Sequence, residues 1–257
     1  MVRTCVCILT IGCIVWAQRP TDADATALIE RGRQNALEYT KSLPDFECTE
    51  LVRRSTNLRG GGSIPTDKLT ILIRYFQHKE DHKLILIDNK PADRTFEDLQ
   101  GAIGSGEFGS TMSAVFEPST QTSFHWESWK TERKRRTAVY VYKVDVERSR
   151  YHLFNGSGSH MRQAIVGYHG VLEIDSETGE VRHFTYVADR LPKDLVLQSA
   201  STTVDYAFAE VGGQEYLLPA RSVVELQGPG GTSRNVIEFR EYHKFSADSS
   251  IAFGPAK

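Results

Sequence analysis

The sequence predicts an α+β fold that is mainly antiparallel β-structure. We expect a curled sheet or half-open β-barrel covered by an N-terminal helix and a short second helix. One long stretch near the N-terminus has a helical apolar period, and after it short runs of alternating apolar and polar residues follow one another, separated by tight turns. Such runs are typical of antiparallel neighbours, because parallel strands need a crossover connection. A sheet of this many strands curls as its twist accumulates, so helices or a ligand must fill its concave face.

Composition limits the function classes. Hydrophobic residues make up 40% of the 257 residues and charged residues 25%, which argues against wholesale disorder. The net charge is −2, so no long-range field selects nucleic acid or an anionic membrane, and we expect no nucleic-acid partner. Neither a linker nor an internal repeat stands out, so we expect a single curled antiparallel-sheet domain over residues 18–257.

Residues 1–17 predict a secretory signal peptide. Arg3 precedes an uncharged apolar run at 5–16, and small side chains at the two positions that a signal peptidase recognises place cleavage after Ala17. The run is too short to span a bilayer comfortably, and no later segment approaches that length, so we expect no transmembrane segment in the mature chain. The expected location is therefore outside the cytoplasm, periplasmic or extracellular.

An alternative for the same segment is a lipoprotein anchored through Cys13. Gly12-Cys13 resembles a lipobox. However, Thr10 stands where Leu is usual and the apolar stretch before Cys13 is short, and both observations favour the plain signal peptide. After cleavage only Cys48 remains of four cysteines, so we expect no internal disulfide. Its place in an apolar–polar alternation predicts a buried thiol.

The long helix is predicted over Asp22–Ser42. Thr21 can cap it, and Pro44 ends it. Small and apolar residues recur on one face at three- and four-residue steps: Ala25, Leu28, Ile29, Gly32, Ala36, Tyr39 and Leu43.

Strands and turns follow the helix. We expect strands at 46–56, 68–76 and 83–87, with a glycine-rich turn at 59–62 and a charged turn at 78–82. The pattern then breaks at 91–118, where a glycine-rich loop at 101–109 leads to a short second helix. That helix is predicted from the spacing of four apolar residues: Phe108, Met112, Val115 and Phe116.

The second half is again predicted as strands. The first pair covers 122–130 and 137–146, with the cationic run 130–136 as its solvated turn and with Phe124 and Trp126 on the face opposite Trp129. A hairpin is predicted at 168–188, where Asp175 to Gly179 form the turn. Further predicted segments are an exposed loop at 155–159 and strands at 202–211, 215–218, 220–227 and 235–245.

Aromatic residues recur on strand faces that could line the concave side of the sheet. These ligand-binding candidates are Tyr75, Trp126, Tyr140, Tyr142, Phe184 and Tyr186. They can be core residues packed under the helices, as strand aromatics usually are. They can also form a hydrophobic cleft for a lipid, an acyl chain or a lipidated peptide.

Motifs for catalysis or cofactors are weak. Gly104-Ser-Gly106-Glu-Phe-Gly109 is a literal G-x-G-x-x-G, but no parallel strand is predicted before it, which disfavours a dinucleotide site. His78 and His82 have metal-ligand spacing only on a helix, and their flanks predict strands. No G-x-S-x-G nucleophile elbow occurs. We therefore expect no enzyme, no cofactor, no metal and no catalytic residues.

The hairpin also supports a family resemblance. Leu172-Glu-Ile-Asp175 and Thr178-Gly179-Glu-Val181, preceded by the strand 136–142, resemble the LolA/LolB and RseB-type half-barrels of bacterial envelopes. The stretches GEFGS, FHWESW and YLLPARS are similar to uncharacterised exported proteins of acidobacterial type. The resemblance implies a half-barrel fold; a shared fold does not transfer a ligand.

Two functional hypotheses follow. The first is a non-enzymatic exported protein that binds a hydrophobic ligand, namely a lipid, an acyl chain or a lipidated peptide, in the concave face of the sheet. The alternative is an envelope sensor or protein-interaction domain with a filled core and no small ligand, whose edges or basic turn contact an envelope protein.

Overall fold

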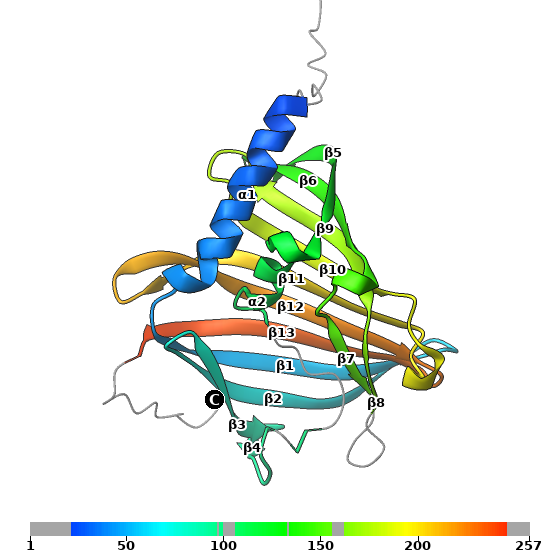
Figure 1. The fold of residues 1–257 in the computed structure, drawn as a ribbon. Helices are drawn as coiled ribbons and strands as arrows, with labels where there is room; N and C mark the ends of the chain where they lie inside the picture. Colours follow the sequence, from blue (N-terminus) through cyan, green and yellow to red (C-terminus); the bar gives the residue numbers. More distant parts are fainter. Residues whose placement is uncertain (1–21, 97, 100–105, 133, 156–161, 246–257) are drawn as a thin grey trace, which may run out of the picture.

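The computed structural model describes residues 22–96, 98–99, 106–132, 134–155 and 162–245 (Figure 1). The predicted signal peptide, the Cys13 lipobox and the Thr21 cap lie outside the described residues. So do Gly104 and residues 156–159 of the predicted exposed loop.

The helices and strands, in chain order, are α1 (Asp22–Ser42), β1 (Phe46–Leu58), β2 (Ser63–Phe76), β3 (Lys79–Ile87), β4 (Lys90–Pro91), α2 (Ser110–Phe116), η1 (Pro118–Thr120), β5 (Ser123–Glu132), β6 (Arg135–Val144), η2 (Val146–Arg148), β7 (His152–Asn155), β8 (Arg162–Ile165), β9 (Gly167–Asp175), β10 (Val181–Asp189), η4 (Lys193–Leu195), β11 (Ser199–Val211), β12 (Gln214–Gly228) and β13 (Gly231–Lys244).

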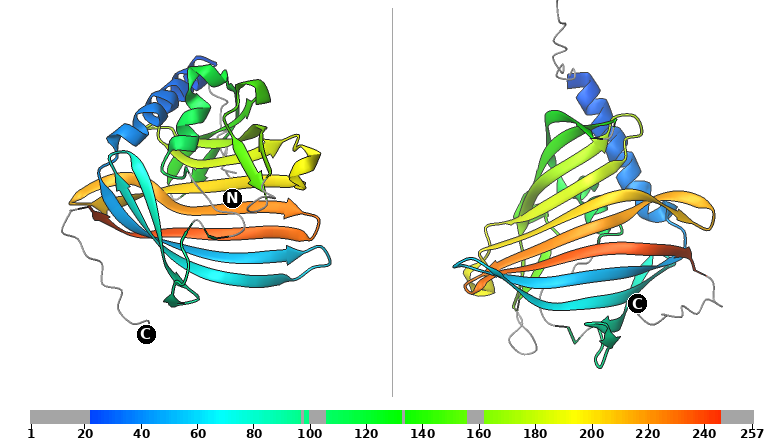
Figure 2. Two further views of the ribbon diagram at one scale, coloured as in Figure 1. Left: turned by 60° about the horizontal axis from the view of Figure 1, so that its bottom comes forward. Right: turned by 180° about the vertical axis from the view of Figure 1, so that it is seen from behind.

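Within the described residues, eleven strands form one antiparallel sheet in the order β4-β3-β2-β1-β13-β12-β11-β10-β9-β6-β5, and β7 and β8 form a separate pair. The pairing of β1 with β13 joins the N-terminal strands to the C-terminal ones. The edge strands β4 and β5 do not pair with each other, so the sheet curls without closing (Figures 1 and 2). The predicted fold class, a curled antiparallel sheet with a long and a short helix, is confirmed.

Helix α1 has the predicted bounds, because its apolar face packs against the sheet. Leu28, Ala36, Tyr39 and Leu43 are buried. Gly32 permits the close approach of α1 to β9: a Cβ at this position would lie 2.7 Å from the Ile174 Cδ1 atom. Helix α2 packs beside α1 and buries Met112, Val115 and Phe116, as the spacing of these residues predicts.

Strands β9 and β10 form the predicted hairpin. Ile174 pairs with Val181 and Leu172 with Phe184, and all four side chains are buried. The alternation therefore gives the correct buried face.

Two predicted charged turns are wrong. The sequence predicts a turn over 78–82, but the chain turns at Gln77 and His78, whose φ values are 50° and 61°, and β3 begins at Lys79. A two-residue turn with both φ values positive joins antiparallel strands tightly, so the charged residues that follow it lie in the strand. The cationic run 130–136 belongs mostly to β5 and β6, and Lys134, with φ of 68°, lies at the tip between them.

Two further differences come from β-bulges. A bulge between Trp126 and Ser128 shifts the alternation of β5, so Trp129 does not lie on the opposite face. Its ring lies 6.1 Å from that of Trp126, and both pack against the core. A second irregularity, at Ala220, lets the two strands predicted over 215–227 form one strand, β12. A bulge inserts a residue without ending a strand.

Candidate functional site

A cavity of about 430 Å³ lies between α1 and the hairpin formed by β11 and β12. The end of the hairpin β9–β10 and one residue of α2 complete its wall. Its less polar lining residues are Ala36, Tyr39, Leu43, Met112, Val181, Phe208 and Leu217. Its polar lining residues are Asn35, Glu38, Ser42, Thr178, Glu180, Glu215 and Tyr216. The cavity therefore has an apolar wall and a polar rim.

The different lengths of the strands explain why a cavity forms here. Strand β10 pairs with β11 only as far as the pair His183 and Asp205. Strands β11 and β12 stay paired up to Val211 and Gln214. The end of the β11–β12 hairpin therefore extends past β10, and α1 passes over the space that β10 leaves.

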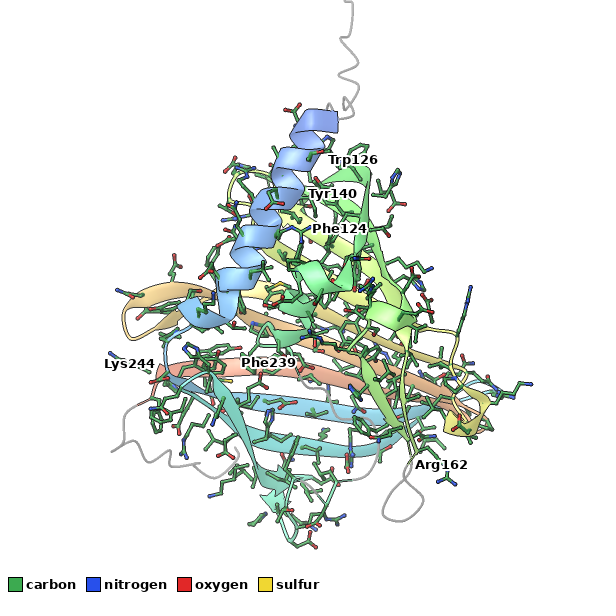
Figure 3. The ribbon with its side chains drawn as sticks, in the orientation of Figure 1. Phe124, Trp126, Tyr140, Arg162, Phe239 and Lys244 are labelled. Atoms are coloured by element: carbon green, nitrogen blue, oxygen red, sulfur yellow. The ribbon has the colours of Figure 1, made fainter. Side chains whose placement is uncertain are left out.

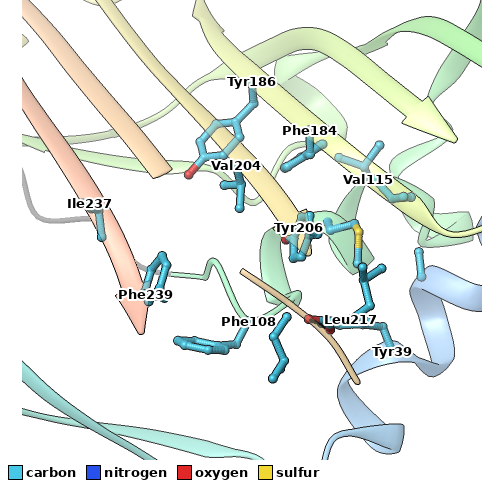
Figure 4. Packing of buried hydrophobic residues seen from close by; sticks show 14 of the residues in the cluster. Tyr39, Phe108, Val115, Phe184, Tyr186, Val204, Tyr206, Leu217, Ile237 and Phe239 are labelled. Atoms are coloured by element: carbon cyan, nitrogen blue, oxygen red, sulfur yellow. Dashed lines mark hydrogen bonds between the residues drawn. The ribbon is translucent and has the colours of Figure 1, made fainter. Parts of the chain in front are cut away.

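Helix α1 contributes one face to the cavity. Ala36 and Tyr39 are three residues apart, so they lie on the same side of the helix, and Leu43, directly after its last residue, also lines the cavity. The Tyr39 hydroxyl donates a hydrogen bond of 2.8 Å to the Leu217 carbonyl of β12. Burial raises the pKa of Tyr39 well above its ordinary value, so the phenol remains a donor. Figure 4 shows Tyr39 and Leu217 next to each other beside the helix.

The turn between β9 and β10 holds α1 in place. Arg31 donates hydrogen bonds of 2.9 and 3.2 Å to the carbonyls of Ser176 and Glu177. Asn35 donates one of 3.0 Å to the carbonyl of Thr178. These contacts attach the middle of the helix to one side of the cavity.

Asp175 shapes that turn. Its Oδ1 accepts hydrogen bonds from the backbone N–H groups of Glu177 and Thr178, and its Oδ2 accepts one of 3.0 Å from Arg135. Burial opposes ionisation of Asp175, but these donors outweigh it and hold the pKa below its usual value. Gly179 adopts φ of 78°, where a side chain would be strained. The carboxylate is thus occupied in fixing the turn.

The charged residues that line the cavity are all glutamates: Glu38, Glu180 and Glu215. Glu38 forms an exposed ion pair of 2.9 Å with Lys41. A carboxylate rim repels an anionic head group and accepts hydrogen bonds from neutral or cationic ones.

The six aromatic residues predicted from the sequence lie in the core. Tyr75, Tyr140, Tyr142, Phe184 and Tyr186 are at most 6% exposed, and Trp126 is partly buried. Their packing is mutual: the rings of Tyr142 and Phe184 are stacked 5.8 Å apart. Figure 3 places Trp126 and Tyr140 beside the upper part of α1. None of the six lines the cavity beneath α1, so their contact with a ligand stays a prediction.

The tyrosine hydroxyls of this group also tie the helix to the sheet. Tyr140 donates to the Ala25 carbonyl at 2.9 Å, and Tyr75 donates to the Thr40 carbonyl at 3.1 Å. These contacts satisfy buried hydroxyls and hold both ends of α1.

A buried carboxylate, Glu107, lies near the same helices. Glu107 accepts a hydrogen bond of 3.3 Å from Ser222, and its carbonyl accepts one of 2.9 Å from Tyr206. Burial, and then the charge of Glu50, raise the pKa of Glu107 to about 7. A glutamate between the glycines of the 104–109 motif was the only signal for it.

Two glycines of that motif, Gly106 and Gly109, serve packing. Gly106 and Gly109 have φ of 88° and 99°. A Cβ at Gly109 would lie 2.3 Å from the Tyr39 ring, so glycine lets the chain enter α2 directly beneath α1.

His82 of β3 lies between two carboxylates. Its Nε2 is 3.3 Å from Glu80, and its Nδ1 is 3.7 Å from Glu50, longer than a hydrogen bond. Burial lowers the pKa of His82, but the two carboxylates outweigh it and raise the pKa to about 10. His82, Glu50 and Glu80 form a structural cluster of three side chains, and the described ranges contain no group of three or more His, Cys, Asp or Glu side chains that could hold a metal ion. Cys48 is buried and free.

No helix in the described part of the chain combines the length and apolarity needed to cross a membrane.

Comparison with known proteins gives similarity in structure only. No family model and no curated protein matches the sequence. A LolA superfamily protein from Nitrosomonas europaea is similar over 85% of this chain and 92% of its own, at 12% identity and a TM-score of 0.36. A DUF1329 family protein from Desulfovibrio piger is similar over 86% and 95%, at 10% identity and a TM-score of 0.38.

A third structure, described as an outer membrane lipoprotein-sorting protein domain from Vibrio parahaemolyticus, covers 88% of this chain and 95% of its own, at 11% identity and a TM-score of 0.37. One of the three is described as a LolA superfamily protein, the superfamily that the sequence resembles. At these identities and TM-scores the three similarities support no inference on ligand or activity.

Proposed function

We propose that this protein is a non-enzymatic binding protein that holds one hydrophobic ligand, a lipid, an acyl chain or a lipidated peptide, in the cavity beneath α1. The observation that carries the proposal is the cavity itself. Its volume of about 430 Å³ falls within the range of about 300–1,000 Å³ that is usual for small-molecule sites. Its apolar wall and polar rim are the arrangement that such sites use.

The rim narrows the ligand class. Because Glu38, Glu180 and Glu215 line the cavity, we propose that the apolar chain enters the wall and that a neutral, zwitterionic or cationic head remains at the rim. The aromatic residues predicted from the sequence would then support the cavity from the core without contacting the ligand.

Native mass spectrometry and a thermal-shift panel test this function. We expect a co-purifying lipid mass, and a higher melting temperature with a fatty alcohol or a choline lysolipid than with a fatty acid of equal chain length. A clean apo mass together with no stabilisation by any member of the panel would overturn the proposal.

Two exposed phenylalanines give a matched pair of variants. Phe208 lines the cavity and is 39% exposed, whereas Phe76 is 42% exposed and does not line it. We expect Phe208→Ala to weaken lipid binding about tenfold, the scale of burying part of an aromatic ring. Phe76→Ala should leave the binding constant unchanged.

The alternative, an envelope sensor or protein-interaction domain with a filled core, is favoured by one observation. Five of the six predicted aromatics are buried against protein side chains. Two results together would favour this second function: a native mass without lipid, and recovery of the folded protein in complex with a partner protein from the envelope fraction.

Export is part of the proposal. We propose a signal peptide over residues 1–17 and a mature chain in the periplasm or outside the cell. The intact mass of the exported protein tests it, because cleavage after Ala17 and lipidation of Cys13 give different masses.

A further inference from the structure

We propose that one end of the sheet is a docking surface for an anionic lipid bilayer. We call it the tip surface and define it as residues 58–64, 190–198 and 228–231 together with strands β7 and β8. Figures 1 and 2 show these segments gathered at one end of the sheet. The cavity lies toward the opposite ends of β11 and β12, so this proposal goes beyond the ligand site.

The segments of the tip surface are in contact with one another. Leu58 pairs with Gly231, which brings the β1–β2 and β12–β13 turns together. The backbone N–H of Gln198 donates a hydrogen bond of 2.7 Å to the Gln227 carbonyl. Asn155 of β7 donates one of 2.6 Å to the Leu195 carbonyl. Four stretches that are distant in sequence therefore form one continuous surface.

Exposed apolar side chains concentrate on this surface. Of the eight large hydrophobic residues exposed in the described ranges, five belong to it: Leu58 (43%), Ile64 (54%), Phe154 (51%), Ile165 (47%) and Val196 (56%). Scattered single exposures are ordinary, but a group at one end of a molecule marks an interaction site.

The backbone at Val196 supports this interpretation. It has φ of 55°, a left-handed conformation, and among the described non-glycine residues with positive φ it alone is β-branched. Such a residue is strained. The strained residue is also the most exposed apolar residue of the connection between β10 and β11.

Charge identifies the occupant. The tip surface carries four cations, Arg59, Arg162, Arg190 and Lys193, against one carboxylate, Asp194. The whole chain has a net charge of −2, so these cations form a local patch. Figure 3 places Arg162 at the outer end of β8. Apolar tips that enter the head-group region, with cations beside them that meet anionic lipids, are typical of peripheral membrane binding.

Vesicle flotation with the mature chain, residues 18–257, tests the proposal. The vesicles contain phosphatidylcholine alone or with about one third phosphatidylglycerol, and the apolar run 5–16 is left out so that only the folded protein can bind them. We expect the wild type to float with the anionic vesicles and to dissociate as salt rises, since each cation near the surface contributes about fivefold.

Variants separate the apolar contribution of the tip surface to vesicle binding from its ionic contribution. We expect Leu58→Ser combined with Phe154→Ser and Val196→Ser to lower anionic-vesicle binding at least tenfold. Arg162→Glu combined with Lys193→Glu should also lower anionic-vesicle binding at least tenfold. The remaining binding of this variant should depend less on salt concentration than that of the wild type. Phe154→Ser alone, which removes an exposed ring from the tip surface, should bind anionic vesicles measurably less than the wild type. The matched control is Phe76→Ser, which removes an exposed ring outside the tip surface and should bind like the wild type. Circular dichroism checks that each variant is folded.

Three outcomes would overturn the proposal. They are equal flotation with neutral and anionic vesicles, wild-type flotation of the triple variant, and no flotation at all. In the last case, a dimer in sedimentation velocity that the triple variant abolishes would assign the tip surface to contact between copies of the chain.

Discussion

Tyr39 of α1 donates a hydrogen bond of 2.8 Å to the carbonyl of Leu217 on β12, at the wall of the cavity. This contact joins the helix to the end of the β11–β12 hairpin, which extends past β10. A buried hydrogen bond therefore attaches the helix to the cavity wall in addition to apolar packing.

Removing that hydroxyl should destabilise the fold. We expect Tyr39→Phe to lower the free energy of unfolding by about 1–2 kcal/mol, because it leaves a buried carbonyl with one hydrogen bond fewer. Urea denaturation measures the change. The control is Tyr216→Phe, because the Tyr216 hydroxyl donates its hydrogen bond to Gln214 at the exposed surface. If the control changed the free energy of unfolding by more than about 0.5 kcal/mol, the loss in Tyr39→Phe could not be assigned to the buried hydrogen bond.

Gly109 should be intolerant of a side chain. In Gly109→Ala the new Cβ would clash with the Tyr39 ring at 2.3 Å, and the residue would keep a φ of 99°. We expect a loss of about 3 kcal/mol or more, from overpacking added to backbone strain.

Gly213→Ala provides the matched comparison for Gly109→Ala. Gly213 has φ of 84°, but a Cβ there meets nothing within 4 Å. Only the backbone strain should remain, about 1 kcal/mol. Equal melting temperatures for the two variants would exclude the close approach of α2 to α1.

Local patterns in the sequence were sufficient to predict the bounds of α1 and the buried face of the β9–β10 hairpin. The helix bounds follow from the apolar spacing and Pro44, and the hairpin face follows from alternation around the Asp175 turn. Both signals act within about twenty residues, where periodicity is informative.

The cavity was not predictable from those patterns. It exists because the pairing of β10 with β11 ends at Asp205 while β11 continues to Val211, and no local period encodes where a neighbouring strand ends. The bulge after Trp126 likewise moved Trp129 to the side of the core. The six aromatics belong to or pack against the core, and alternation alone does not tell a packed face from an open one.

Glu107 should make stability depend on pH. Its folded pKa, about 7, is above the value of 4.5 expected in the unfolded chain. Between these values the folded state holds the proton and the unfolded state does not, so the contribution of Glu107 to stability falls as pH rises from 4.5 through about 7.

Glu107→Gln removes that dependence. We expect this variant to be more stable than the wild type at pH 8, by up to about 3 kcal/mol, and nearly equal to it at pH 4.5. The measurement is the difference in unfolding free energy between the two proteins across this range, because the contribution of His82 then cancels. A difference that is flat with pH would show that Glu107 does not titrate in the folded protein.

Arg31 should control how firmly α1 is docked beside the cavity. Its two hydrogen bonds to the turn at Ser176 and Glu177 are exposed, so we expect Arg31→Ala to cost only about 1 kcal/mol locally. That loss should speed hydrogen exchange of the α1 amides about fivefold, leave the exchange of β1 and β13 unchanged, and accelerate lipid release by the same factor if α1 must move for the ligand to leave. Lys41→Ala is the control, because Lys41 lies on the same helix and, among the described residues, forms its ion pair with Glu38 of that helix. Faster exchange in that variant, or unchanged exchange in Arg31→Ala, would mean that the turn does not hold the helix.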